Sequence, residues 1–222
     1  MGSDFIDKNN MKTKKELLKL HEKYTTGLYP DKWLELTWTH SNIVLEIVKI
    51  IAKDLKKSTG IKVDMDLLTQ GTLLHDIGIY SCFDEDINPN DKLLPYIHHG
   101  FIGAEILKKE GFSLAIQRIA LTHSATGFTK EDILREKLDY EAKDYIPVSL
   151  EEEIVCFADK FHTKYPSFST YEEQVARLKK FDPAREIKME TFKRKFGIPD
   201  LSKLIIKYDP WNKEFDKWFG TI

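Results

Sequence analysis

The chain has few of the features that would direct a protein to a membrane, an oxidising compartment or a polyanionic partner. Only two of its 222 residues are cysteines, and they form no Cys-x-x-Cys motif, so we expect a reduced, cytoplasmic protein. The longest apolar runs, such as residues 47–52, are interrupted by lysine and are too short to span a bilayer. The first residues lack the basic and apolar regions of a signal peptide. A formal net charge of −2 gives no overall field that favours nucleic acid or an anionic membrane.

Patterns typical of β-strands are also missing. No segment alternates apolar and polar residues with period two for long enough to make a sheet. Apolar residues recur instead at helical spacing through most of the chain. The 222 residues, of which 41% are hydrophobic and 32% charged, are enough for one sizeable core. We therefore predict an all-α fold, a compact bundle of many helices.

Caps and apolar periodicity predict where these helices lie. A capping box at residues 13–16 starts the first helix. Apolar residues at helical spacing predict a long helix over residues 40–57, with His40 in its first turn. The next helix follows Asp64 or Asp66 and is apolar on more than one side, which is typical of a buried, central helix. Further helices are predicted over residues 97–109, 113–122, 130–138 and 149–161, and three or four more follow residue 169, separated by Pro183, residues 197–199 and Pro210.

An adjacent imidazole and carboxylate, His75 and Asp76, stand at the end of an apolar run, just before Gly78. Hydrophobic segments rarely carry such a pair without a partner for the charge. Alone, the pair fits a buried ion pair as well as it fits a metal site. Neighbouring side chains on a helix point about 100° apart, so His75 and Asp76 would not face the same point. A metal centre resolves this, because the carboxylate can bridge two ions while the histidine binds one of them.

Further imidazoles and carboxylates fall at or beside helix positions with apolar neighbours. Each one alone would be a satisfied core residue or an ion-pair partner. Together they would need many separate partners, whereas one or two metal ions satisfy them all. Imidazole with carboxylate suits Fe, Mn, Zn or Ni better than Mg or Ca. The candidate ligands are His40, His75, Asp76, His99 (with His98 as its ambiguous neighbour), His123 and Asp159.

The order and the local strings of these residues resemble the HD superfamily of metal-dependent phosphohydrolases. The strings are residues 39–41, the HDIG form of the name-giving motif at 74–78, a His-x-x-x-Gly-Ala helix at 99–107, and residues 121–124 and 157–160. The resemblance covers residues 38–162. It implies an HD domain over residues 38–165, preceded by an N-terminal helical segment (1–37) and followed by a helical C-terminal extension (166–222) packed on the same body.

The resemblance also implies a ligand set. The simplest members of the superfamily hold one ion, here with His40, His75, Asp76 and Asp159. The binuclear members, such as HD-type bacterial diadenosine tetraphosphate hydrolases, add two histidines that match His99 and His123, and Asp76 would then bridge. We choose His99 over His98 because Gly103 follows it at the spacing of the family. We expect two ions per chain, with Fe or Mn favoured and Mg, Zn, Ni or Co also compatible, and His75 and Asp76 as the catalytic pair.

The activity implied is hydrolysis of a phosphoester or phosphoanhydride in a nucleotide or another small phosphorylated compound, by metal-activated hydroxide. Phosphate needs cationic anchors, and the candidates are Lys160 first, then Lys164 and His162, with His98 beside the site; a solvated helix face is the alternative for each. The acidic stretch at residues 81–95 would edge the pocket as a loop or lid. Two features depart from known branches: there is no Gly-Tyr-Pro motif, and the insertion at 126–153 is longer than in the compact dinucleotide hydrolases.

Two other functions stay open. The same six ligands occur in HD-type mixed-valence di-iron oxygenases, which cleave C–C or C–P bonds, and a non-catalytic ligand-binding module is a third reading. The basic residues of the tail alternate with glutamates, so we expect a solvated face and no nucleic-acid partner. Trp211, Phe215 and Trp218 share one helical face and would dock the last helix on the body or form a homodimer contact.

Overall fold

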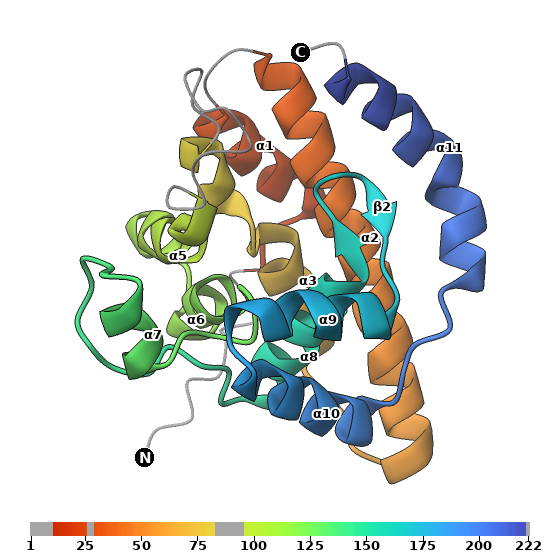
Figure 1. The fold of residues 1–222 in the computed structure, drawn as a ribbon. Coiled ribbons are helices and arrows are strands. Elements are labelled where there is room, and N and C mark those ends of the chain that lie inside the picture. Colours follow the sequence, from red (N-terminus) through yellow and green to blue (C-terminus); the bar gives the residue numbers. More distant parts are fainter. Residues whose placement is uncertain (1–10, 26–28, 83–95, 221–222) are drawn as a thin grey trace.

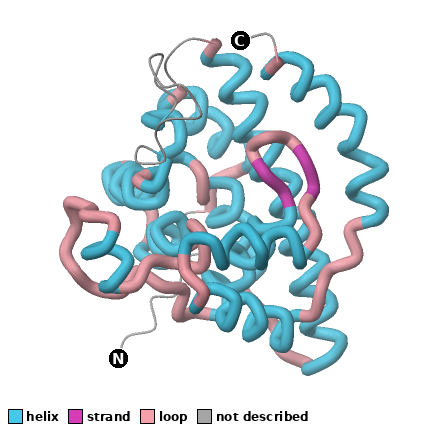
Figure 2. Tube along the Cα trace, in the orientation of Figure 1, coloured by secondary structure: helices cyan, strands magenta, loops and turns pink. Residues whose placement is uncertain are grey.

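The computed structural model describes residues 11–25, 29–82 and 96–220, and it is a bundle of helices (Figures 1 and 2). The all-α prediction is therefore confirmed. Within the described part, no helix is both long enough and apolar enough to cross a membrane. The helices are α1 (Lys14–Tyr24), α2 (Pro30–Thr59), α3 (Met65–Leu74), α5 (His99–Lys109), α6 (Leu114–Thr122), α7 (Lys130–Arg135), α8 (Leu150–Ala158), α9 (Tyr171–Phe181), α10 (Ala184–Phe196) and α11 (Ser202–Phe219), with the 3₁₀-helices η2 (Ile77–Cys82) and η3 (Asp159–Phe161).

Helix α2 is the longest element, and it begins at Pro30 rather than near residue 40 as predicted. Proline suits the first turn of a helix because its missing N–H would have no partner there. Leu36 is fully buried, and Trp33 and Trp38 pack against a hydrophobic cluster, so tertiary contacts hold this first part of α2 in place. His40 therefore lies well inside the helix, not in its first turn.

Helices α2 and α3 lie between two hydrophobic clusters. The first, which we call the main hydrophobic cluster, joins them to α6, α8, α9, α10 and α11, and the second joins them to α1, η2, α5 and α6. The sequence predicts Asp64 or Asp66 as the cap of α3. The structure shows Asp64 in this place, where its side chain accepts hydrogen bonds from the backbone N–H groups of Asp66 and Leu67. The prediction that α3 is buried and central is confirmed, since Leu68, Leu73 and Leu74 have no exposed surface.

Helix α5 packs very closely against η2, and Gly78 makes this approach feasible. A Cβ atom at position 78 would lie 2.2 Å from the carbonyl oxygen of His99 and 2.4 Å from the backbone nitrogen of Gly103. Only glycine fits such a backbone-to-backbone contact. The sequence motif that begins at His75 thus fixes how near the helix carrying His99 can come.

Three helices follow residue 169, as predicted, but Pro210 lies inside α11 rather than between helices. Proline removes one backbone hydrogen bond from a helix, and the packing of Tyr208 and Trp211 on the main hydrophobic cluster keeps the helix continuous. A short antiparallel hairpin of β1 (His162–Thr163) and β2 (Ser167–Phe168) precedes these helices and was not predicted.

Several predicted boundaries shift. The predicted start of the HD domain, between residues 37 and 38, falls inside α2. Its predicted end, between residues 165 and 166, falls inside the hairpin. The division into an N-terminal segment, an HD domain and a C-terminal extension therefore stays a prediction. Helix α7 ends at Arg135 instead of residue 138. Most of the predicted loop at 81–95 lies outside the described residues.

Candidate metal centre

Six side chains from five separate segments meet in the middle of the molecule. His40 projects from α2, and His75 and Asp76 come directly after α3. His99 starts α5, while His123 and Asp159 follow the last residues of α6 and α8. Helix α3 ends at Leu74, so His75 and Asp76 lie in the turn that follows it, and the Nε2 atom of His75 comes within 3.2 Å of Asp76 Oδ2. The convergence of these segments brings together all six predicted ligands.

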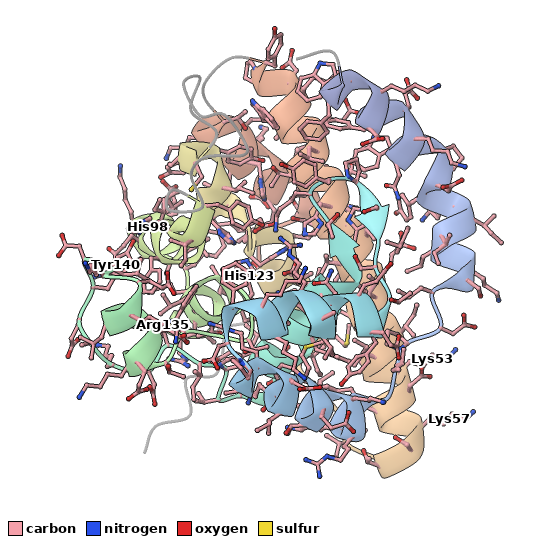
Figure 3. All side chains as sticks on the ribbon, viewed as in Figure 1. Lys53, Lys57, His98, His123, Arg135 and Tyr140 are labelled. Carbon is pink, nitrogen blue, oxygen red and sulfur yellow. The ribbon has the colours of Figure 1, made fainter. Side chains whose placement is uncertain are left out.

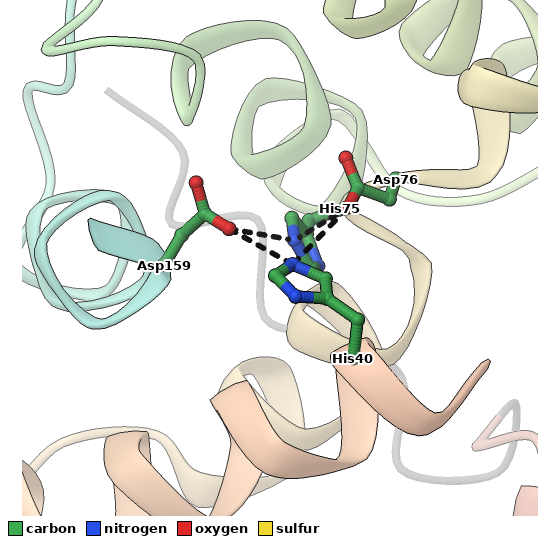
Figure 4. A group of neighbouring side chains, drawn as sticks. All are labelled: His40, His75, Asp76 and Asp159. Atoms are coloured by element: carbon green, nitrogen blue, oxygen red, sulfur yellow. Dashed lines mark hydrogen bonds and ion pairs between the residues drawn. The ribbon is translucent and has the colours of Figure 1, made fainter. Parts of the chain in front are cut away.

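The first group consists of His40, His75, Asp76 and Asp159 (Figure 4). The Nε2 atom of His40 lies 3.3 Å from Asp76 Oδ2 and 3.0 Å from Asp159 Oδ1. The Nε2 atom of His75 lies 3.2 Å from Asp76 Oδ2 and 3.4 Å from Asp159 Oδ1. The four side chains are buried, with Asp159 the most exposed at 9%. Two imidazoles thus alternate with two carboxylates around one point.

The second group consists of Asp76, His99 and His123. The Nε2 atoms of the two histidines are 2.9 Å apart, and they lie 3.4 Å and 3.2 Å from Asp76 Oδ1. Asp76 therefore turns one oxygen to each group. His123 is buried and lies in the middle of the view in Figure 3, whereas His98 lies at the left side, at the start of α5.

Backbone contacts determine which nitrogen of each histidine faces the centre. The Nδ1 atom of His99 bonds to the carbonyl oxygen of Tyr96, and that of His123 bonds to the carbonyl oxygen of Ala120 at 2.7 Å. A carbonyl only accepts, so Nδ1 carries the proton and the Nε2 lone pair points inward. Burial lowers the pKa of both histidines, that of His99 to about 3, and both stay neutral. Two lone pairs that face each other and a carboxylate fit a cation.

Two carboxylates favour a positive charge on His75, where a cation would fit. Burial lowers the pKa of His75, but the carboxylates of Asp76 and Asp159 outweigh burial and raise this pKa to about 9. The Nδ1 atom of His75 donates to the carbonyl oxygen of Thr72 at 2.6 Å, so a proton added without metal would sit on Nε2, a buried atom that has no hydrogen-bond partner among the described residues. A divalent ion that replaced this proton would meet the same two negative charges. The six residues therefore fit one or two divalent metal ions.

The two predicted lysine anchors reach the centre in different ways. The Nζ atom of Lys160 contacts Asp159 Oδ2 at 2.7 Å and the carbonyl oxygen of His123 at 3.1 Å. The Nζ atom of Lys164 lies 2.7 Å from Asp76 Oδ2 and 4.0 Å from Asp159 Oδ1. Burial opposes ionisation of Asp76, but His75 and Lys164 outweigh it and hold the pKa of Asp76 well below its usual value.

Two other candidates are not placed as predicted. His98 bonds through Nδ1 to the hydroxyl of Tyr140, 2.9 Å away, and takes no part in either group. His162 lies behind His40, with the two Nδ1 atoms 2.9 Å apart, so its ring faces another histidine of this region rather than a place for substrate. Burial lowers the pKa of His162 to about 3, which leaves it without the charge that a phosphate anchor needs. No motif in the sequence indicates the contact between His40 and His162, which are 122 positions apart.

A comparison with known proteins shows which family this chain matches. The model of the HD domain matches residues 37–164, more than half of the chain. An uncharacterized protein of Methanocaldococcus jannaschii is 40% identical over 110 residues, which are 49% of this chain and 57% of the relative. The tRNA (cytidine(56)-2'-O)-methyltransferase of Picrophilus torridus is 33% identical over 117 residues, which are 53% of this chain and 30% of that enzyme. The chain thus spans just over half of the first relative and less than a third of the second.

Among solved structures, the chain resembles the HD domain of the L. monocytogenes phosphodiesterase PgpH, determined in complex with cyclic-di-AMP. The TM-score is 0.51 at 20% sequence identity, and the superposition covers 87% of this chain and 97% of that domain. At this identity the likeness is one of fold.

Proposed function

The chain belongs to the HD domain family, and from this premise we propose that it is a metal-dependent phosphohydrolase acting on a nucleotide or another small phosphorylated compound. One observation carries the proposal. Asp76 turns Oδ1 to His99 and His123, and Oδ2 to His40 and His75, which is how a carboxylate between two metal ions is arranged. A structural ion pair would not need four imidazoles around one buried carboxylate.

We assign one ion to His40, His75, Asp76 and Asp159, and a second to Asp76, His99 and His123. Bound divalent ions would lower the pKa of water and act as Lewis acids toward phosphate oxygens. Iron or manganese as the native metal, a cytoplasmic location and a homodimer stay predictions. The six residues equally fit the oxygenase reading, and the experiment below separates the two.

Lys164 is the better candidate for a phosphate anchor, although the sequence ranked Lys160 first. Lys160 is buried and already has two partners, one of which is the carboxylate of Asp159. Its contacts suit a residue that holds Asp159 in place. The ammonium of Lys164 lies against the ring of Tyr96 and against two carboxylates whose charge a metal ion would neutralise. With metal bound, we expect this ammonium to turn to the phosphate oxygens of the substrate.

The proposed substrate class follows from the comparisons with known proteins. PgpH was solved with a cyclic dinucleotide, which favours nucleotides among the compounds to try first. The Gly-Tyr-Pro motif of one cyclic-dinucleotide branch is absent from this chain. The match to tRNA methyltransferases covers less than a third of the Picrophilus enzyme, and we transfer no methylation activity from it.

The test is a hydrolysis screen on protein that has been stripped of metal and reconstituted with Mn²⁺ or with Fe²⁺. Phosphate release is measured with mononucleotides, dinucleotides and simple phosphate esters, while an oxygen electrode follows the same reactions and a polyol and a phosphonate. Asp76→Ala should abolish turnover, whereas Asp66→Ala, an exposed aspartate in the first turn of α3, should retain it. Oxygen consumption without phosphate ester cleavage would instead favour the oxygenase.

A further inference from the structure

His40 differs from the other three histidines of the centre in the partner of its Nδ1 atom. His75, His99 and His123 each bond through Nδ1 to a backbone carbonyl three residues earlier. His40 lies inside a helix, where nearby carbonyls are already used by the helix itself. Its Nδ1 atom lies 2.9 Å from Nδ1 of His162, a side chain of strand β1. The orientation of His40 therefore depends on a side chain rather than on the backbone.

The contact continues from His162 into the C-terminal extension. The Nε2 atom of His162 lies 3.3 Å from Oδ1 of Asn212, a residue of α11. Both side chains are buried, His162 at 2% and Asn212 at 6% exposure. Three side chains from α2, β1 and α11 thus form one hydrogen-bonded row that ends at the centre.

The direction of the protons in this row follows from its outer end. The amide oxygen of Asn212 can only accept, so His162 carries its proton on Nε2 and offers a lone pair at Nδ1. His40 must then donate from its own Nδ1. With a metal ion in place of the direct contact between His40 Nε2 and Asp159 Oδ1, 3.0 Å apart, Nε2 would then offer the free lone pair that a metal ligand needs.

Helix α11 is fixed to α2 on both sides of His40. The indole N–H of Trp211 donates to Glu35 Oε1 at 2.9 Å, and the hydroxyl of Tyr208 donates to Glu46 Oε1 at 2.6 Å. Figure 1 shows α11 running along the outer side of α2. Asn212 follows Trp211 directly, so the docking of α11 holds its amide at His162.

We propose that His162 and Asn212 are positioning residues of the metal centre, and that helix α11 thereby takes part in metal binding. The HD domain match ends at residue 164, so Asn212 lies outside the matched region. The inference rests on the proposed metal centre. It assigns a role in metal binding to a helix that the family motifs do not reach.

The test is a calorimetric titration of Mn²⁺ into the metal-stripped full chain. Asn212→Leu keeps the size of the side chain and removes the acceptor, and we expect it to weaken the site that includes His40 about 10-fold. His162→Leu should weaken the same site about 10-fold to 100-fold. His162→Asn returns an acceptor near the position of Nδ1 and should restore much of the affinity.

The matched control is Lys213→Leu, because Lys213 is an exposed neighbour of Asn212 whose ion pair is with Asp209 of the same helix. Thermal unfolding in EDTA measures any loss of docking in each variant, and Lys213→Leu should leave Mn²⁺ affinity unchanged. Nitrogen NMR of the imidazoles adds a structural readout, because the wild type should carry the His162 proton on Nε2. Asn212→Leu should lose this preference.

The outcomes separate the two proposals. Wild-type binding of Mn²⁺ with unchanged affinity in Asn212→Leu and His162→Leu would overturn the positioning role alone. Equal losses of affinity in Asn212→Leu and Lys213→Leu would also overturn it, since the loss would then not depend on the amide of Asn212. Failure of the wild-type chain to bind Mn²⁺ would overturn the metal centre and this inference together.

Discussion

At the scale of single residues, Asp76 and the histidines around it divide into two groups, and each group would hold one metal ion. Asp76 belongs to both groups, whereas His123 belongs only to the second. The second group has no other carboxylate among the described residues, so its affinity for a cation rests on Asp76, His99 and His123 alone. Substitution of one histidine should therefore remove one ion without disturbing the other.

We expect His123→Ala to bind one metal equivalent fewer than the wild type. The matched control is His98→Ala, because His98 is a histidine beside His99 that bonds to Tyr140 and lies outside both groups. Metal content measured against protein concentration, with circular dichroism to check the fold, decides the matter. Equal metal content in wild type and His123→Ala would mean that the second group holds no ion.

The two lysines should differ in what their loss affects. Lys164→Met removes the ammonium proposed to meet the phosphate, so we expect a higher KM, by about 10-fold, with metal content unchanged. Lys160→Met removes a buried contact to Asp159 and should lower thermal stability and metal affinity instead. Steady-state kinetics and metal titration on both variants check this, and identical effects of the two changes would contradict the assignment.

The sequence was sufficient to predict which six side chains converge, but not the residues that contact them from behind. His40, His75, Asp76, His99, His123 and Asp159 sit in short strings whose residue types and order are readable along the chain. His162 and Asn212 carry no such string, and their contacts join positions 122 and 50 residues apart. Contacts of this kind depend on how α2, β1 and α11 pack, which a pattern along one chain does not contain.

At the scale of elements, the distance between η2 and α5 sets the geometry of the second group. We expect Gly78→Ala to destabilise the fold by about 1–3 kcal/mol, because its Cβ would overlap the backbone of α5 at His99 and Gly103. It should also weaken the second metal site, since His99 would be displaced. Urea unfolding and metal titration measure the two effects.

Gly103→Ala is the control for that prediction. A Cβ atom at position 103 would meet Gly78 N at 3.4 Å and Ala120 Cβ at 3.5 Å, which are ordinary contacts. Alanine also favours the helix, so the change should be tolerated within about 1 kcal/mol. A larger loss of stability in Gly103→Ala than in Gly78→Ala would contradict this view of the contact.

Capping residues in the sequence predicted the start of those helices whose first turn is held by hydrogen bonds from a nearby side chain. Thr13 forms the predicted capping box with Glu16, and Ser113 caps α6. Ser149 caps α8, but Glu152 pairs with Arg118 and does not complete the predicted box. The early start of α2 and the passage of α11 through Pro210 come from tertiary packing, which overrides local propensity.

At the scale of the whole molecule, acid should destabilise the fold through a buried histidine outside the metal centre. The Nδ1 atom of His21 accepts from the hydroxyl of Tyr80 and its Nε2–H donates to the carbonyl oxygen of Leu73, both at 2.8 Å. Burial lowers the pKa of His21 from 6.5 to about 4. The unfolded chain therefore binds a proton at a higher pH than the folded chain, so stability falls as pH falls from 6.5 to about 4.

We expect the contribution of His21 to cost about 2 kcal/mol of stability between about pH 7 and pH 5. Urea unfolding in EDTA at these two values, for the wild type and for His21→Gln, isolates it, because the other histidines are common to both chains. The wild type should lose about 2 kcal/mol more than the variant. The same loss in both chains would mean that His21 is not buried in its neutral form.

The central claim is that the six converging side chains hold divalent metal ions, and metal analysis tests it most directly. The purified chain and its Asp76→Ala variant are reconstituted with Mn²⁺, desalted and measured by plasma mass spectrometry against protein concentration. The account predicts two equivalents in the wild type, one for each group that shares Asp76. It predicts none retained by Asp76→Ala. Full metal content in that variant, or none in the wild type, would contradict the account.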